Sequence, residues 1–161
     1  MTSTMLYVLC VLIGGVTGLR TMTGIAVVAI GAQTSWPQLG WLHLAGTGLG
    51  FLARPVSMYI FVALAIGELI SDKLPVPARI QPGPLVARAA FGGLSASALA
   101  VAAGESWIAP VLFGAIAAVI GAYAGYWLRR TITSRGVMDL PIALLEDATA
   151  ILLAVFAVSR F

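Results

Sequence analysis

The first long apolar stretch decides the fold: residues 5–32 read MLYVLCVLIGGVTGLRTMTGIAVVAIGA. A helix needs about 20 mostly apolar residues to cross a bilayer core about 30 Å thick, and this stretch is longer than that. Its one charged residue, Arg20, lies roughly 22 Å along a regular helix, near the bilayer middle. A central arginine costs about 2.5–3.5 kcal/mol on insertion scales, so we expect the guanidinium to face protein or water and to have a partner. Glycine and threonine residues on both sides of Arg20 predict that the helix is broken there.

The whole chain shares this apolar character. Of its 161 residues, 60% are hydrophobic and only 9% are charged, and the mean hydropathy is +1.02. An ordinary soluble domain is about 45–50% apolar and about 25% charged, and a soluble fold of this size would leave many apolar side chains in water. The composition excludes a free cytosolic domain, a disordered chain and a nucleic-acid binder. We therefore expect one all-α domain over residues 1–161, a polytopic helical bundle surrounded by the lipid bilayer.

Five apolar stretches have the length of a membrane-spanning helix. They are residues 5–32, 55–72, 82–103, 107–128 and 141–159. A sixth stretch, 41–53, has only about 13 residues, so it could be a short tilted helix, a re-entrant half-helix or an interfacial helix. The sequence thus predicts five or six membrane-embedded helices, the first of them broken near Arg20.

Basic residues in two connectors set the orientation. The first connector carries Lys73 and Arg79, and the second, two crossings later, carries three arginines between residues 129 and 135. The two connectors must share a side, and the positive-inside rule makes that side cytoplasmic. The sequence therefore predicts cytoplasmic loops at 73–81 and 129–139. With six crossings both termini lie outside, and with five the N-terminus moves inside.

Four carboxylates fall at one depth, near the cytoplasmic ends of their helices. Glu68 and Asp72 lie one helical turn apart, so they share a face. Glu146 and Asp147 follow Pro141 by one to two turns. A rise of about 1.5 Å per residue puts all four carboxylates within about 10 Å of those helix ends. Two distant segments therefore deliver acids to the same layer.

Cations accompany these acids. Lys73 and Arg88 fall at the same depth, and Arg20 reaches the layer from deeper in the membrane. Clustered carboxylates can carry a proton or bind a cation. This predicts an ion site in a small transporter or channel-like protein, with the arginines as counter-charges. Alternatively, the charges form a salt-bridge collar in a structural or assembly protein. Arg20 by itself fits either an anion site at a discontinuous helix or a buried ion pair.

A third hypothesis is an enzyme that acts on a lipid phosphate head group, with acids binding Mg²⁺ and arginines binding phosphate. The sequence has no recognisable catalytic motif and no histidine near the acids, so we expect no enzyme and no catalytic residues. With a single cysteine, Cys10, the chain cannot form a thiolate metal cluster by itself. With a single histidine, His43, most kinds of zinc and haem site are excluded as well. We expect no cofactor, and the sequence leaves metal binding open.

Small residues line one face of the fourth predicted helix, at Gly114, Ala118, Gly121 and Gly125. Small side chains at helical spacing let two helix backbones approach closely. The face predicts close helix packing, either inside the subunit or across a homodimer. We expect a homo-oligomer that handles a small ion or solute and binds no nucleic acid.

Four sequence features together resemble a known family. They are Gly18-Leu19-Arg20, the string GELISDKLP at 67–75, Arg88 in a helix start rich in alanine and glycine, and the late Glu146-Asp147. The combination resembles the small bacterial membrane proteins catalogued as domain of unknown function 4126, over most of the chain. The string at 67–75 is its most specific part. The resemblance implies a compact helical protein of the bacterial inner (cytoplasmic) membrane, and it brings no activity, substrate or catalytic residue.

Overall fold

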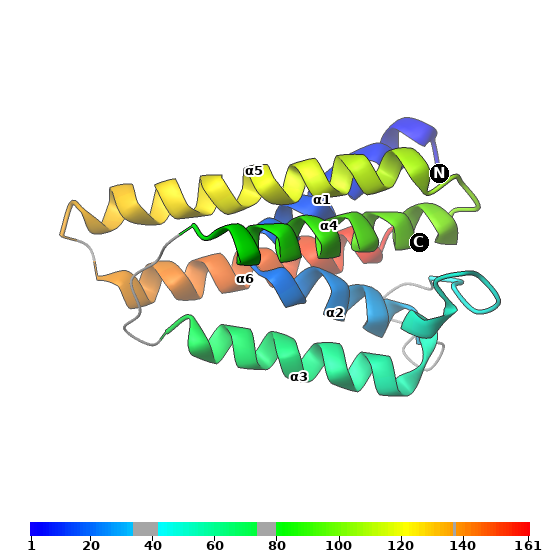
Figure 1. Cartoon of the computed structure of the whole chain (residues 1–161), viewed down its shortest axis with the longest axis horizontal. Helices are drawn as coiled ribbons and strands as arrows, with labels where there is room; N and C mark the ends of the chain where they lie inside the picture. The colour runs from blue at the N-terminus through cyan, green and yellow to red at the C-terminus, as the bar shows by residue number, and fades with distance from the viewer. Residues whose placement is uncertain (34–41, 74–79, 137) are drawn as a thin grey trace.

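The computed structural model describes residues 1–33, 42–73, 80–136 and 138–161, and in these ranges the chain is all-α, as predicted (Figure 1). The described α-helices are α1 (Ser3–Leu19), α2 (Thr21–Gly31), α3 (Pro55–Ser71), α4 (Pro82–Ala102), α5 (Ile108–Thr133) and α6 (Asp139–Val158). A 3₁₀ turn, η2 (Gly50–Ala53), precedes α3.

Local sequence explains where several helices begin and end. Pro55 and Pro82 stand in the first turns of α3 and α4, where the missing N–H costs no hydrogen bond and the fixed φ suits the helix. Thr2 caps α1, because its hydroxyl accepts a hydrogen bond from the Met5 amide at 3.3 Å. Gly104 has a φ of +75° in the turn between α4 and α5, a left-handed conformation that glycine adopts without strain.

The chain reverses direction at Arg20. Helix α1 ends at Leu19 and α2 begins at Thr21, while Arg20 has an extended backbone with φ −136° and ψ 106°. A methyl group on Gly24 of α2 would lie 3.5 Å from the Ile13 carbonyl oxygen of α1. A straight helix would separate these two residues by roughly 16 Å. Helices α1 and α2 therefore form a helical hairpin with Arg20 at its vertex (Figure 1).

The predicted break near Arg20 is confirmed, but the prediction that residues 5–32 form one span is wrong. The stretch forms two helices of 17 and 11 residues, and the second runs back from Arg20, so the two do not make one continuous crossing. The sequence placed the break correctly because glycine and threonine gather there. It did not give the direction of the chain after the break, where α2 packs against α3, α4, α6 and α1.

The short apolar stretch 41–53 does not form a sixth membrane-embedded helix in its described part. Residues 42–49 are irregular or in turns, and only η2 follows before α3. Gly46 has a φ of +81°, which no regular helix contains. The Thr47 hydroxyl donates to the Leu44 carbonyl oxygen at 2.7 Å and stabilises the turn. Trp41 lies outside the described residues.

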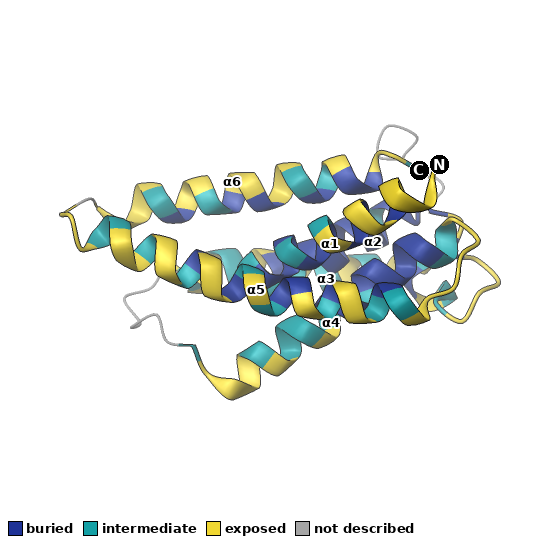
Figure 2. Ribbon diagram, turned by 90° about the horizontal axis from the view of Figure 1, so that it is seen from above, coloured by how far each residue is buried: buried dark blue, intermediate teal, exposed yellow. Residues whose placement is uncertain are grey.

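Three helices, α4, α5 and α6, are long and apolar enough to cross a membrane, while α1, α2 and α3 are apolar but shorter. Figure 2 shows exposed residues along the outer sides of α5 and α6 and buried ones on the sides that face the other helices. Many exposed side chains are large and hydrophobic, among them Ile120, Leu145 and Leu152. An apolar outer surface of this extent suits lipid surroundings. The helix lengths and the surface both support a membrane protein.

The termini and the connectors lie at opposite ends of the bundle (Figure 1). The N- and C-termini share one end with the turn between α4 and α5. At the other end, which we call the connector end, α3 and α5 finish and α4 and α6 begin. Lys73 and Arg135 therefore lie at the same end of the molecule. Arg79 lies outside the described residues.

The small-residue face of α5 packs inside the chain, against α1 and α4 and, at its last residue, close to α6. Its members are Gly114, Ala118, Gly121 and Gly125. A methyl group on Gly114 would overlap the carbonyl oxygen of Gly92 in α4, and one on Gly121 would overlap that of Gly15 in α1. Packing inside the subunit, one of the two predicted alternatives, accounts for this face. A homo-oligomer stays a prediction.

Candidate functional site

The Arg20 side chain leaves the hairpin vertex and reaches α3 and α6. Its backbone amide donates to the Val16 carbonyl oxygen at 2.8 Å, and its carbonyl oxygen accepts from the Thr23 amide at 3.3 Å. The residue is only 2% exposed. A guanidinium is always charged and carries five N–H donors, so in a buried position it needs acidic partners.

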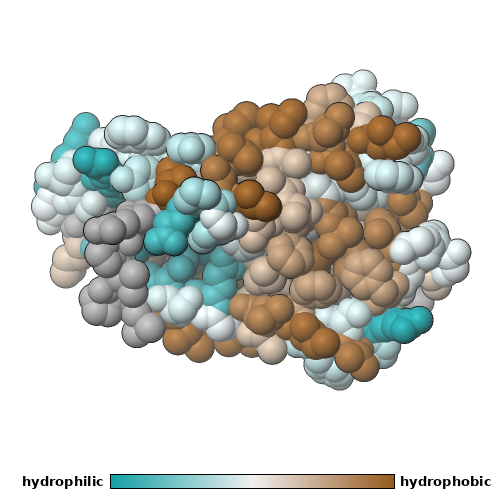
Figure 3. Space-filling view, in the orientation of Figure 1, coloured by the Kyte–Doolittle hydropathy of each residue, from teal (hydrophilic) through white to brown (hydrophobic). Residues whose placement is uncertain are grey.

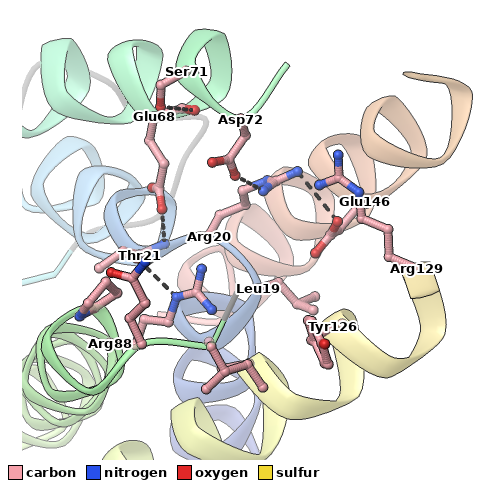
Figure 4. A pocket seen from close by; sticks show the side chains of 16 residues that line it. Leu19, Arg20, Thr21, Glu68, Ser71, Asp72, Arg88, Tyr126, Arg129 and Glu146 are labelled. Carbon is pink, nitrogen blue, oxygen red and sulfur yellow. Dashed lines mark hydrogen bonds and ion pairs between the residues drawn. The ribbon is translucent and has the colours of Figure 1, made fainter. Parts of the chain in front are cut away.

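Three carboxylates from two helices bind this guanidinium. Nε donates to Asp147 Oδ1 at 2.5 Å, one terminal nitrogen donates to Glu146 Oε2 at 3.4 Å, and the other donates to Asp72. Figure 4 shows the contacts with Asp72 and Glu146. Asp72 caps the end of α3, whereas Glu146 and Asp147 belong to α6. Arg20 therefore ties the hairpin to both helices. The contacts bring its side chain to the acids, and that Arg20 reaches them from deeper in the membrane stays a prediction.

Lys73 extends this cluster. Its Nζ donates to Asp147 Oδ2 at 2.6 Å and to the Leu69 carbonyl oxygen at 2.7 Å. Asp147, which is 7% exposed, thus bridges Arg20 and Lys73. We call the five residues of this cluster the Arg20 network: Arg20, Asp72, Lys73, Glu146 and Asp147. In the network three carboxylates face two cations, so one negative charge is in excess.

Glu68 binds the N-terminus of α2 and not a cation. Its two carboxylate oxygens accept hydrogen bonds from the Thr21 and Met22 amides, each at 2.7 Å. Helix α2 has no side-chain cap from its own N-cap residue. Glu68 satisfies two of the amides that every helix start leaves without a partner, and it places a negative charge at the positive end of the helix dipole. This contact fastens α3 to the hairpin a second time.

Arg88 approaches the vertex from α4. Its Nε donates to the Thr21 hydroxyl at 3.4 Å, and none of the ion pairs among the described residues includes it. The structure thus gathers all six charged residues that the sequence proposed for binding, although they come from three helices (α3, α4 and α6) and the vertex. They are Arg20, Glu68, Asp72, Arg88, Glu146 and Asp147. What they bind stays a prediction.

A cavity of about 370 Å³ lies among these residues. Its charged lining consists of Arg20, Arg88, Arg129, Glu68, Asp72 and Glu146, three arginines and three carboxylates. Leu19, Thr21 and Tyr126 also line the cavity (Figure 4). Figure 3 shows hydrophilic residues in a hollow towards the connector end, beside a largely apolar surface. Pockets for small ligands have volumes of about 300–1,000 Å³, so the charged residues leave room for a small solute.

Arg129 lines the cavity although the sequence placed it in a loop. Helix α5 continues to Thr133, so Arg129 is helical, and its guanidinium donates to both carboxylate oxygens of Asp139 at 2.6 and 2.5 Å. Asp139 is already the first residue of α6. The predicted loop 129–139 is therefore shorter than expected. The sequence treated Arg129 only as a topology signal, because helix periodicity alone does not tell which side chains meet across a bundle.

In the part of the chain that the structure describes, no three histidine, cysteine, aspartate or glutamate side chains come together as a metal site would require. The acids near the cavity are engaged by Arg20, Lys73, Arg129 and the amides of α2. Cys10 is buried in α1, and its thiol donates to the Ala96 carbonyl oxygen at 3.5 Å.

Comparison of the chain with protein-family models, with curated proteins and with solved structures finds no match. The resemblance to the domain of unknown function 4126 therefore stays a prediction, and the function must be argued from the site alone.

Proposed function

We propose that this chain is a small transporter of the bacterial inner membrane that couples the movement of a small solute to a proton or another cation. One observation carries the proposal: a cavity of ligand size reaches Arg20 beside a network with one excess negative charge. Charged side chains at membrane depth are costly unless paired, and in membrane proteins they mark substrate and proton pathways.

The network offers one place for a proton. Glu146 has the longest contact with Arg20, at 3.4 Å, and it also lines the cavity. A proton on Glu146 would leave two carboxylates facing two cations, so the network would be neutral. Arg20 would then lose one of its three acidic partners. The hairpin, which Arg20 ties to α3 and α6, would be held less firmly, and discontinuous helices of this kind carry binding sites in known transporters.

The topology that fits this role places the connector end in the cytoplasm. Helices α3, α4, α5 and α6 would each cross the membrane, and the α1–α2 hairpin would enter from the outer side. Basic residues at the connector end support this orientation. The segments 73–81 and 129–139 are then on the cytoplasmic side, and both termini are outside.

Cysteine labelling tests the topology. In a Cys10→Ala background, Glu105→Cys and Arg135→Cys place single exposed thiols at the two ends of the bundle. A membrane-impermeant maleimide should label Glu105→Cys in intact spheroplasts and Arg135→Cys only after permeabilisation. The opposite pattern would contradict the proposed orientation.

Uptake into liposomes tests the function. Purified protein in phosphatidylcholine vesicles, under an inward proton gradient, should accumulate at least one solute of a panel of phosphate, carboxylates, amino acids and sugars. Glu146→Gln should lower the uptake rate by about tenfold or more. The glutamine cannot take up or release a proton, so the network stays neutral, and losing the charge of one partner in a buried ion pair costs several kcal/mol. Glu105→Gln is the matched control, since Glu105 is exposed at the opposite end, and its uptake should equal that of the wild type.

A structural or assembly protein is the second candidate. One guanidinium holds carboxylates of α3 and α6 on the hairpin, which is also what a salt-bridge collar requires. Folded protein that gives no uptake above empty vesicles for any solute would favour this candidate. The lipid-phosphate enzyme gains no support, because the acids that would bind its metal are engaged by cations and amides.

A further inference from the structure

Arg88 lines the cavity but stands outside the Arg20 network. The residue is half-buried, and its one hydrogen bond to a described side chain joins Nε to the Thr21 hydroxyl at 3.4 Å. Figure 4 shows its guanidinium directed into the space between Thr21 and Leu19, with the terminal nitrogens towards the cavity.

Every acidic side chain of the protein has another partner or lies elsewhere. The sequence holds six aspartates and glutamates, and all six belong to the described residues. Three bind Arg20, Glu68 caps α2, and Asp139 binds Arg129. The sixth, Glu105, lies in the turn between α4 and α5 at the opposite end, where the C-terminus also lies. None of these carboxylates forms an ion pair with Arg88.

An arginine without a carboxylate partner beside a cavity favours an anionic ligand. The planar guanidinium presents paired N–H donors that match the two oxygens of a carboxylate or a phosphate. A half-buried cation without a counter-charge is unfavourable, and an anion in the cavity would supply that charge. The Thr21 hydroxyl, next to the Arg88 Nε, adds a further donor at the same wall.

We propose that Arg88 and Thr21 form an oxyanion site in this cavity, and that the ligand is a small molecule with a carboxylate or phosphate group. Such a group comes either from a free solute or from the head group of an anionic lipid at the cytoplasmic face. This inference rests on the proposed function, because it names the class of solute that the cavity takes.

Binding to the full-length protein in nanodiscs tests the site without any need for transport. In nanodiscs of phosphatidylcholine alone, radiolabelled inorganic phosphate and succinate are the probes for a free solute. In mixed nanodiscs, preferential retention of phosphatidic acid over phosphatidylcholine, read by native mass spectrometry, is the probe for a head group. We expect saturable binding in one of the two arms.

Variants of Arg88 test whether that binding takes place at Arg88. Arg88→Gln should weaken it by about tenfold or more, as expected for the loss of charge-assisted hydrogen bonds. Arg88→Lys should bind with intermediate affinity, because it keeps the charge but loses the paired donors. Arg135→Gln removes an exposed arginine at the same end and should bind like the wild type. An unchanged melting temperature in Arg88→Gln shows that the variant is folded.

Absence of saturable binding in both arms overturns the inference, and so does equal binding by Arg88→Gln and the wild type. Its failure can be told from failure of the proposed function. Proton-driven uptake of a neutral or cationic solute, without anion binding, would retain the transporter and remove the oxyanion site. Anion binding that depends on Arg88, without any uptake, would retain the oxyanion site and remove the transporter.

Discussion

Arg20→Gln should lower the melting temperature of the detergent-purified protein by about 6–20 °C. The substitution leaves Asp72, Glu146 and Asp147 without their shared guanidinium, and only Lys73 remains to bind one of them. Removing one partner of a buried ion pair destabilises a protein by about 3–5 kcal/mol, and each kcal/mol shifts the melting temperature by about 2–4 °C in a chain of this length. The hairpin would also lose its ties to α3 and α6.

Three further variants separate the network from a general effect of losing an arginine. Arg135→Gln removes an exposed arginine at the connector end and should melt within about 2 °C of the wild type, as surface substitutions usually do. Arg20→Lys should recover only part of the stability, because an ammonium does not reach three carboxylates as a planar guanidinium does. Adding Glu146→Gln to Arg20→Gln should also recover part, since among the described ion pairs Glu146 has Arg20 as its only cation and its charge is then uncompensated. A melting temperature of Arg20→Gln close to that of Arg135→Gln would contradict this account of the network.

Gly114→Val should prevent α5 from packing on α4 and leave little protein in a monodisperse state. A methyl group at Gly114 would already overlap the carbonyl oxygen of Gly92 and the side chain of Ala96, and valine adds two further carbons. Forcing extra carbons into a packed core costs about 1–3 kcal/mol when side chains can adjust. Here the clash is partly with backbone, so we expect a cost at or above the upper end. Size-exclusion chromatography of the detergent extract measures the monodisperse fraction.

Gly67→Val is the matched control for this substitution. Gly67 lies inside α3 and is exposed, and no atom would lie within 4 Å of an added methyl group. The helical setting and the change in side chain are the same, so the two variants differ in contact with a neighbouring helix. Gly67→Val should give the elution profile of the wild type. Equal profiles for the two variants would show that the approach of α4 and α5 is not as close as described.

The depth of the charged residues could be predicted from the sequence. Asp72 ends one apolar run and Glu146 follows the start of another, and a fixed rise per residue then puts both at one level of the bundle. Contact with Arg20 follows because a buried guanidinium requires acids and the chain has few of them. The membrane class followed from composition in the same way.

The hairpin could not be predicted, because its cause is tertiary. Glycine and threonine weaken a helix near Arg20, yet the fold-back depends on Gly24 lying against α1 and on Glu68 of α3 binding the first amides of α2. Those partners lie far away in the sequence. Similarly, Glu68 was grouped with the other acids by spacing, but its partner is a helix N-terminus that only the fold creates.

The segment 41–53 and Arg129 show two further limits of hydropathy. Apolar residues predicted a short helix at 41–53, whereas Gly46, with a φ of +81°, and its neighbours form turns. A charged residue predicted a loop at Arg129, whereas α5 continues to Thr133 and Arg129 pairs with Asp139. Mean hydropathy describes only the composition of a segment. It reports neither the backbone conformation of a glycine nor an ion pair made by an arginine.

The initial rate of proton-driven solute uptake by Glu146→Gln, set against that of Glu105→Gln in vesicles of equal protein content, tests the transport role of the Arg20 network most directly. The account predicts wild-type uptake for Glu105→Gln and a loss of about tenfold or more for Glu146→Gln, with both proteins folded. Equal uptake by the two variants, or no uptake above empty vesicles by the folded wild type, would contradict it.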